Sequence, residues 1–252
     1  MPGWRYADAH DIDTETVGLP EYCRAIQAFG FRVWSNVSTT AGAFIEAGVP
    51  ATVLGEAWPF PIPPEPPKDV DVVTVGANRW ASITRKALER FRGTWRELPE
   101  MPHERLITEL GRGRVLVHCS RVEGNSRLGT EARLMGTCCV GLASNRFAVG
   151  FDETAGGAMV EQVDDVADVV ERLLADTADL ERRQALARAQ ARQQTDWDAF
   201  VGRVGDAISA IESESERPDA PWREIAGLLA ERERHLNEMV SLVQTPPFGA
   251  GG

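Results

Sequence analysis

Short apolar runs alternate with amphipathic segments over the C-terminal two thirds of the chain, from Asp69 onward. Apolar runs of this length are typical of buried strands, and apolar residues three and four positions apart are typical of helices. One such strand covers residues 115–117 and is followed by a glycine-containing turn and a helical segment. Strands that alternate with helices predict a parallel sheet with crossover helices, so the predicted fold class is α/β.

A shorter unit of the same kind precedes this region. The pattern predicts a helix, a strand, a second helix and a second strand over residues 20–29, 32–34, 39–47 and 51–54. The last three of these elements form a β-α-β unit. Residues 1–18 are polar and acidic without clear periodicity, and they predict no element.

Proline marks the main boundary of the chain. Residues 59–68, PFPIPPEPPK, can continue neither a helix nor a central strand, and they predict a semi-rigid linker. A Pro-x-x-Pro ligand for another protein module is the alternative interpretation. The predicted organisation is a partial N-terminal unit, the linker, a main domain and a C-terminal helix, at residues 1–58, 59–68, 69–211 and 218–243.

Charge and hydropathy exclude two classes of function. The formal net charge of −11 argues against a nucleic-acid groove, which needs clustered cations. No apolar run reaches the length of a membrane span, and the N-terminus lacks a basic region followed by an apolar one. We therefore expect a cytoplasmic protein without a membrane span.

The four cysteines have no metal-type spacing to one another or to the histidines. Cys138 and Cys139 open an apolar strand and are predicted to point to opposite faces of the sheet. All four, Cys23 and Cys119 included, are predicted to be small buried hydrophobic residues, and a metal or redox role is the alternative.

The turn from Ser120 to Gly136, SRVEGNSRLGTEARLMG, carries the candidate chemistry. It joins the strand at 115–117 to a helix, and it holds two carboxylates, Glu123 and Glu131, with seven residues between them. A turn that opens a helix offers free N–H groups and the positive end of the helix dipole, which suit phosphate. A carboxylate further along can accept hydrogen bonds from sugar or ribose hydroxyls. The pattern therefore predicts a site for a nucleotide-linked sugar.

This segment resembles the donor site of retaining GT-B glycosyltransferases (glycosyl transferases group 1 type), whose hallmark is two glutamates with seven residues between them. The likeness extends to DVDVVTVGAN, MPHERLITELGRG, VLVHCSRVEGNSRLGTEARLMGTCCVGL, NRFAVGFDETAGGAMVEQVDDVADVVERLLAD and TDWDAFVGRV, in the family's order. Together these pieces place residues 69 to about 211 on the family's C-terminal, donor-binding domain. The resemblance implies a Rossmann-like parallel sheet of the GT-B C-terminal domain type, with a short partial N-terminal β-α-β unit and a C-terminal helix.

The resemblance also assigns roles to the turn. Glu131 would accept hydrogen bonds from the ribose of the donor, and Glu123 would lie beside the transferred sugar. Gly124, Asn125 and Ser126 would supply backbone N–H groups to the diphosphate. The alternatives are a surface glutamate favoured by the helix dipole for Glu131, and a loop carboxylate paired with Arg121 or Arg127 for Glu123.

Cations beside the leaving diphosphate are the second requirement. In the family an arginine and a lysine after the opening strand supply them, and here VGANRWASITRKALERF offers Arg79, Arg85 and Lys86 without the usual spacing. We take Arg79 and Lys86 as the catalytic candidates, each with a solvated helix-face charge as the alternative. Gly76 would allow a phosphate to approach at this turn.

The resemblance implies glycosyl transfer from a nucleoside-diphosphate sugar to an unknown acceptor, with retention of configuration. It implies no cofactor and no metal, since no Asp-x-Asp ligand pair precedes a plausible site. The N-terminal part is shorter than the family's, and one strand-helix unit of the donor domain is missing. A homo-oligomer or a separate N-terminal-domain subunit could complete the acceptor side. The alternative is a non-catalytic or split-enzyme remnant that binds a nucleotide-sugar or an assembly partner.

Overall fold

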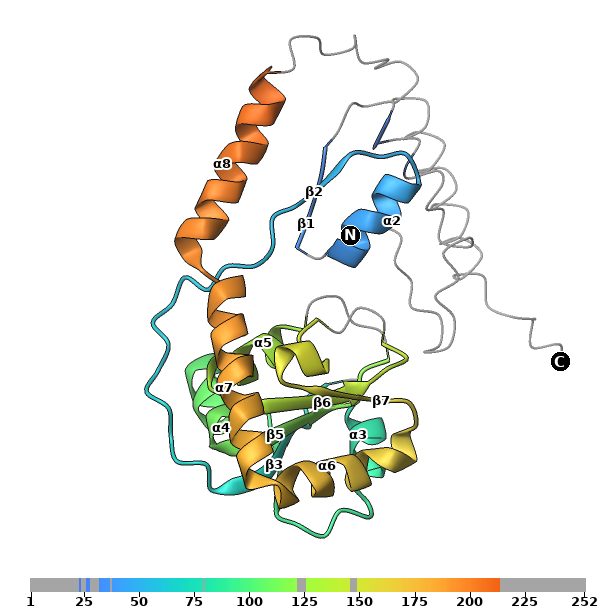
Figure 1. Ribbon diagram of the computed structural model, residues 1–252, viewed down its shortest axis with the longest axis vertical. Coiled ribbons are helices and arrows are strands. Elements are labelled where there is room, and N and C mark those ends of the chain that lie inside the picture. Colours follow the sequence, from blue (N-terminus) through green and yellow to red (C-terminus); the bar gives the residue numbers. More distant parts are fainter. Residues whose placement is uncertain are drawn as a thin grey trace, which may run out of the picture.

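A computed structural model gives the structure of the chain (Figure 1). It describes residues 23, 26–27, 32–36, 38–78, 80–121, 126–145 and 149–213. The predicted C-terminal helix at 218–243 lies outside these residues.

The main domain is a five-stranded parallel sheet with helices on both faces, as the sequence pattern predicts. Its strands are β3 (Val70–Val75), β4 (Trp95–Leu98), β5 (Gly113–His118), β6 (Cys138–Leu142) and β7 (Ala158–Val160), in the spatial order β4-β3-β5-β6-β7. The helices are α3 (Ala81–Ala87), α4 (His103–Arg112), α5 (Arg127–Leu134), α6 (Val166–Ala175), α7 (Thr177–Gln194) and α8 (Trp197–Ser213). Two 3-10 turns, η1 (Glu153–Ala155) and η2 (Val163–Asp165), flank β7.

Each face of the sheet has its own apolar core. One core joins the sheet to α3 and α6, and the other joins it to α4 and α5 (Figure 1). Cys138 belongs to the first core and Cys139 to the second, which confirms that they point to opposite faces. All four cysteines are buried and unpaired, and burial raises the pKa of Cys119, Cys138 and Cys139 to about 12.

The strand order is a common doubly wound order. Numbered along the domain, the strands lie in the order 2-1-3-4-5, the flavodoxin-like arrangement. The strand β4 pairs directly with β3, with Val72 opposite Trp95. A sheet of this order is complete in itself, so the expected loss of one strand-helix unit stays a prediction.

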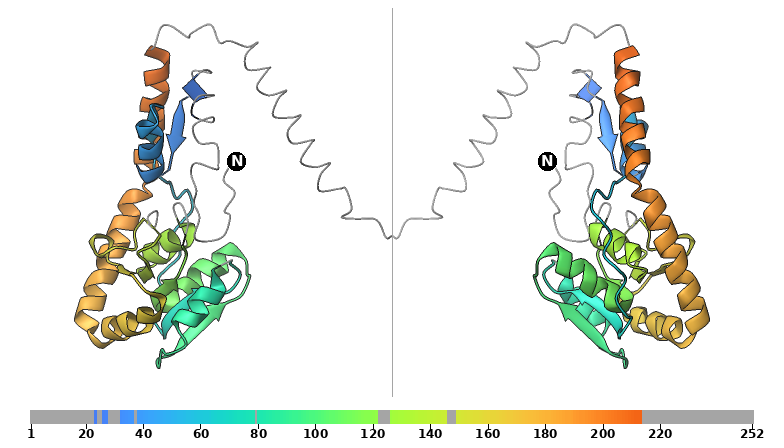
Figure 2. Two further views of the ribbon diagram at one scale, coloured as in Figure 1. Left: turned by 90° about the vertical axis from the view of Figure 1, so that its right-hand side faces the viewer. Right: turned by 90° about the vertical axis from the view of Figure 1, so that its left-hand side faces the viewer.

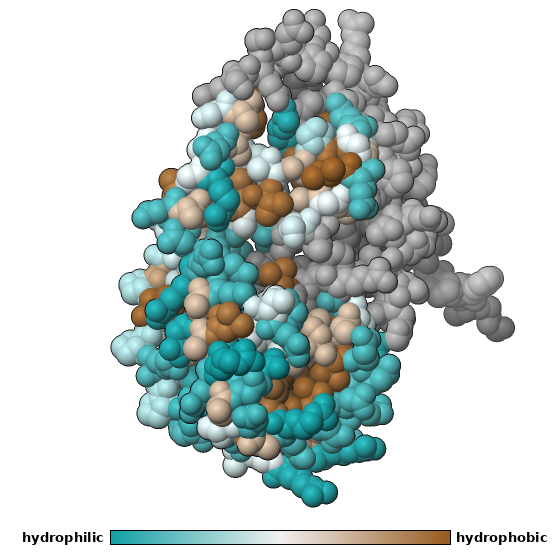
Figure 3. Space-filling view, viewed as in Figure 1, coloured by the Kyte–Doolittle hydropathy of each residue, from teal (hydrophilic) through white to brown (hydrophobic). Residues whose placement is uncertain are grey.

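The front unit consists of β1 (Val33–Ser35), α2 (Ser38–Glu46) and β2 (Ala51–Val53). The two strands are parallel, with Val33 opposite Ala51, so the predicted β-α-β unit is confirmed. Among the residues that the structure describes, this sheet has two strands, and Trp34 and Val53 are exposed on it. Figure 2 shows this unit and α8 extending beyond the main domain. The face seen in Figure 3 is largely hydrophilic, with separate hydrophobic patches over both parts.

The proline-rich segment contains no helix or strand and is fixed by specific contacts. The backbone N–H of Trp58 donates to the carbonyl of Thr195 at 3.0 Å, and Arg203 donates to the carbonyl of Leu54. At the other end, Lys68 Nζ donates to the carbonyl of Met135 and to Thr137 Oγ1, at 2.8 and 3.0 Å. The segment therefore runs from α7 and α8 to the end of α5.

Phe151 fixes the position of α5 on the sheet. Its side chain is buried, and it packs beside Gly129 in α5 and Gly141 in β6. A Cβ atom would lie 2.5 Å from the Phe151 ring at Gly129, and 2.8 Å from it at Gly141. Both positions therefore need glycine because the ring occupies the space of a side chain.

Replacing Gly129 with alanine tests this packing. We expect Gly129→Ala to lower the free energy of unfolding by about 1–3 kcal/mol, because the ring or the helix must move. Gly202→Ala in α8 is the matched control, since a Cβ there meets no atom within 4 Å. The free energy of unfolding of the control variant should rise by about 0.5–1 kcal/mol, because alanine has a higher helix propensity than glycine. Urea denaturation measures both, and equal effects would contradict the role given to Phe151.

Lys68 gives the chain a pH-dependent stability. Burial lowers the pKa of Lys68 to about 8 from its ordinary 10.5. Between these pH values the unfolded chain binds more protons than the folded chain, so this residue makes stability rise with pH. Between pH 7 and 10.5 the free energy of unfolding of the wild type should therefore rise by up to about 3 kcal/mol relative to that of Lys68→Met. Urea denaturation across this range measures the difference, and a constant difference would contradict the expectation.

Candidate functional site

The candidate site lies at the start of α5, beyond the carboxyl end of β5. Ser126 is the N-cap of α5, and its side chain accepts a hydrogen bond from the N–H of Gly129 at 3.2 Å. Such a cap is a strong signal for helix initiation, and it leaves other N–H groups of the first turn free of intrahelical partners. Ser126 is thus where the sequence analysis expects it, at the turn that opens the helix.

Glu131 is a buried carboxylate held between two helices. It is only 4% exposed, and its Oε1 lies 2.9 Å from His103 Nε2 at the first residue of α4. Arg127, one turn earlier on α5, places Nη2 4.0 Å from the same oxygen. A surface glutamate favoured only by the helix dipole would be exposed, so the buried and partnered Glu131 does not match that alternative.

A second buried charge lies on the same helix. Arg133 is 1% exposed, and its Nη2 donates to Gln194 Oε1 at 2.9 Å. Its Nε and Nη1 are buried and have no hydrogen-bond partner among the described residues. Burial lowers the pKa of Arg133, and the nearby carboxylates of Glu56 and Asp152 act in the opposite direction. The sequence gives no sign of this burial, because EARL reads equally well as an exposed helix face.

The predicted cations are only partly described, and those that are lie on α3. Arg79 lies outside the described residues, as do Glu123, Gly124 and Asn125. Arg85 is bound to Glu97 of β4, with Nε 2.6 Å from Oε2. Lys86 is exposed in the last turn of α3, and its side chain makes no hydrogen bond or ion pair within the described residues.

Gly76 follows β3 at the expected turn, but the space beside it is filled. Its N–H donates to the carbonyl of Leu98 at 2.9 Å. A Cβ at Gly76 would lie 2.4 Å from Glu97 Oε1, so the glycine accommodates this carboxylate. A phosphate that approached Gly76 would meet the negative charge of Glu97 unless that side chain moved.

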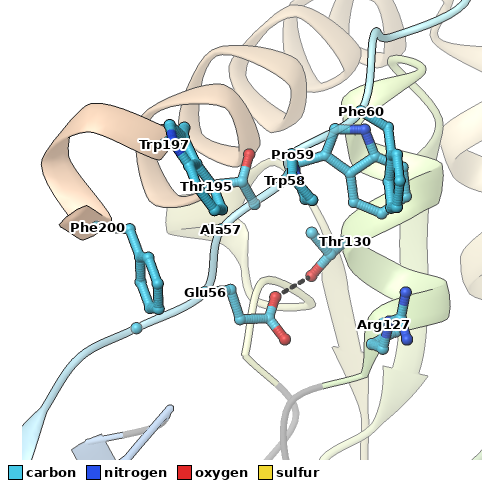
Figure 4. Close-up of a pocket in the computed structure, with 11 residues that line it drawn as sticks. Glu56, Ala57, Trp58, Pro59, Phe60, Arg127, Thr130, Thr195, Trp197 and Phe200 are labelled. Atoms are coloured by element: carbon cyan, nitrogen blue, oxygen red, sulfur yellow. Dashed lines mark hydrogen bonds between the residues drawn. The ribbon is translucent and has the colours of Figure 1, made fainter. Parts of the chain in front are cut away.

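Two hollows lie beside the partners of Glu131 and share Trp58 and Phe60 as a common wall. The larger, about 860 Å³, lies between the proline-rich segment and the start of α4, and His103 lines it. The smaller, about 260 Å³, lies between residues 55–60, α5 and the start of α8, and Arg127 lines it (Figure 4). The rings of Trp58 and His103 are 5.6 Å apart, so the chain just before the linker contacts the candidate site directly. The sequence analysis missed Trp58 and Phe60, because they stand at the edge of a segment interpreted only as a spacer.

Comparison with solved structures identifies the fold. HepE from Anabaena, solved with UDP-glucose, has 17% identity and a TM-score of 0.63, covering 80% of this chain and 71% of that chain. Sucrose-phosphate synthase from Thermosynechococcus elongatus has 16% identity and a TM-score of 0.64, covering 84% of this chain and 65% of that one. Both are GT-B glycosyltransferases, so the expected GT-B-type, Rossmann-like fold is confirmed. No known protein family and no curated protein matches the sequence.

Two further properties concern the described part of the chain alone. None of its helices is both long and apolar enough to cross a membrane. It also contains no group of three or more His, Cys, Asp and Glu side chains that could hold a metal ion.

Removing His103 tests how Glu131 is held. We expect His103→Ala to cost about 1 kcal/mol in free energy of unfolding, because a buried carboxylate loses its hydrogen-bond donor. His103→Gln keeps an N–H donor and should recover part of this loss. Arg105→Ala, an exposed position on the same helix, should change stability by less than about 0.5 kcal/mol. Urea denaturation of the three variants measures the effect, and equal losses in all of them would contradict it.

Proposed function

We propose that the chain transfers a sugar from a nucleoside-diphosphate sugar to an acceptor, with retention of configuration and without a metal. The observation that carries this proposal is the buried Glu131 at the start of α5, held by His103 in a GT-B-type fold. A carboxylate fixed in this way can accept hydrogen bonds from both hydroxyls of a ribose. The UDP and UDP-glucose bound to HepE make uracil the first base to test.

In the proposed reaction the bond between the anomeric carbon and the diphosphate oxygen breaks, and the diphosphate keeps the electron pair. The acceptor oxygen forms the new bond on the same face of the sugar, and its proton passes to the leaving phosphate. Positioning and charge stabilisation would lower the barrier, without a protein nucleophile.

The roles within the site follow from this reaction. Glu131 would hold the ribose, and the N–H groups at the start of α5 would face the diphosphate. Glu123 would hold the transferred sugar and Arg79 or Lys86 the leaving group, as the family resemblance implies. Arg127 is a further cation for the leaving group, because it lies on the first turn of α5 and 4.0 Å from Glu131.

The state of Asp69 and Asp71 supports the metal-independent form of the proposal, because these two carboxylates stand at the amino end of β3, away from the candidate site at the carboxyl ends of the strands. Asp69 is bound to Arg112, and Asp71 accepts hydrogen bonds from Thr94 and Arg114. These contacts hold the pKa of both carboxyl groups below the ordinary range. Both carboxylates are thus already engaged within the protein.

The front unit supports the alternative, a split-enzyme or non-catalytic remnant acting with a partner. Within the described residues this sheet has two parallel strands, whereas parallel sheets are normally larger and covered on both faces. Here Trp34 is 43% exposed and Val53 is 40% exposed on that sheet. A second copy or an N-terminal-domain subunit would complete it. We also propose that residues 59–68 divide the chain into its N-terminal unit and its main domain, and that the protein is located in the cytoplasm.

A thermal-shift titration with UDP, GDP, ADP and TDP tests the donor site. One nucleotide should stabilise the wild type in a saturable way, by about 2.7 kcal/mol at a hundred times its Kd. Glu131→Ala should lose this stabilisation, whereas Glu89→Ala, an exposed carboxylate at the end of α3, should keep it. Hydrolysis of the matching nucleotide-sugar then tests the transfer step. If no nucleotide stabilised the wild type, the donor site would be overturned.

A further inference from the structure

The smaller hollow has the composition of a saccharide site. Trp58, Phe60, Trp197 and Phe200 supply aromatic rings from two separate parts of the chain, and Glu56 and Arg127 supply opposite charges (Figure 4). Trp197 and Phe200 stand beside each other at the start of α8, with ring centroids 6.1 Å apart. Trp197 is 49% exposed, although its ring is large and apolar. An aromatic surface that remains accessible inside a cavity can stack against a ligand.

The polar groups of the hollow are held in place and keep unused hydrogen-bonding capacity. Glu56 Oε2 accepts a hydrogen bond from Thr130 Oγ1 at 3.2 Å, which fixes the carboxylate beside α5 (Figure 4). A carboxylate has further lone pairs for other donors.

These aromatic rings and polar groups together match a sugar better than they match a phosphate or a nucleotide. A pyranose has apolar C–H faces for aromatic rings and hydroxyls that both donate and accept. A phosphate would meet the negative charge of Glu56. The volume of about 260 Å³ lies just below the ~300–1,000 Å³ typical of small-molecule sites, which suits one ring better than a nucleotide.

We infer that this hollow binds one pyranose unit of the acceptor saccharide, an inference that rests on the proposed transferase function. Its place in the fold supports the assignment. Thr130, which fixes Glu56, directly precedes Glu131 on α5. Arg127 lines the hollow and also lies 4.0 Å from Glu131. A sugar bound here would therefore lie next to the proposed donor site, with its hydroxyls beside Glu56 and an apolar face against the aromatic rings.

Saturation-transfer NMR with three methyl glycosides tests the inference. The probes are methyl α-glucopyranoside, methyl β-galactopyranoside and methyl α-mannopyranoside, added to the full chain with and without UDP. We expect saturable transfer to at least one probe. Trp197→Ala should weaken its binding about tenfold by removing the stacking ring. Glu56→Gln, which keeps the size of the side chain, should weaken it about fivefold or more.

The control variants separate this inference from the donor site. Trp95→Ala removes an exposed tryptophan of β4 away from the hollow and should leave saccharide binding unchanged. Glu131→Ala should lose the nucleotide shift and keep saccharide binding, and Trp197→Ala should do the reverse.

Transfer to none of the probes, or equal binding by wild type, Trp197→Ala and Glu56→Gln, would overturn the saccharide site alone. A loss of the nucleotide shift in Trp197→Ala would overturn it too, since the hollow would then belong to the donor. Saccharide binding without any nucleotide shift would overturn the transferase proposal and with it the acceptor role.

Discussion

The close approach of α5 to β6 is the constraint on which the candidate site depends. Phe151 fills the space beside Gly129 on the helix and Gly141 on the strand, where Cβ atoms would lie 2.5 and 2.8 Å from its ring. Packed cores deform little, so a helix seated in this way has one position relative to the sheet. That position sets where Ser126 opens the helix and where Glu131 meets α4.

With α5 fixed, its polar side chains reach three different parts of the chain. Glu131 contacts His103 of α4, Arg133 donates to Gln194 of α7, and Thr130 donates to Glu56, just before the linker. Each contact is sensitive to the position of the helix, because hydrogen bonds weaken steeply with distance and angle. The segment that leads into the linker is thus part of the site's construction, and a shift of α5 would disturb Glu131 and the proposed saccharide hollow together.

The sequence predicted the parts of the structure that depend on local pattern. The parallel sheet with crossover helices, the front β-α-β unit and the burial of the cysteines all follow from periodicity or spacing, and the structure confirms them. Contacts between distant segments left no such signal. The pairing of His103 with Glu131 spans 28 positions, and Thr130 meets Glu56 across 74. Arg133 is buried beside Gln194 of α7 and the turn at Gly150, and no local pattern reveals these contacts.

The surroundings of the predicted cations also depend on contacts between distant segments, and they bear on where a diphosphate can lie. The strand β4 pairs directly with β3 and brings Glu97 beside Gly76. Arg85 is then bound to Glu97 at 2.6 Å, so its charge is already balanced within the protein. The described cation beside the start of α5 is instead Arg127, which is 71% exposed and free to turn toward a ligand. A diphosphate would thus be held mainly from the α5 side, by helix N–H groups and Arg127, on the same edge as the hollow around Trp58.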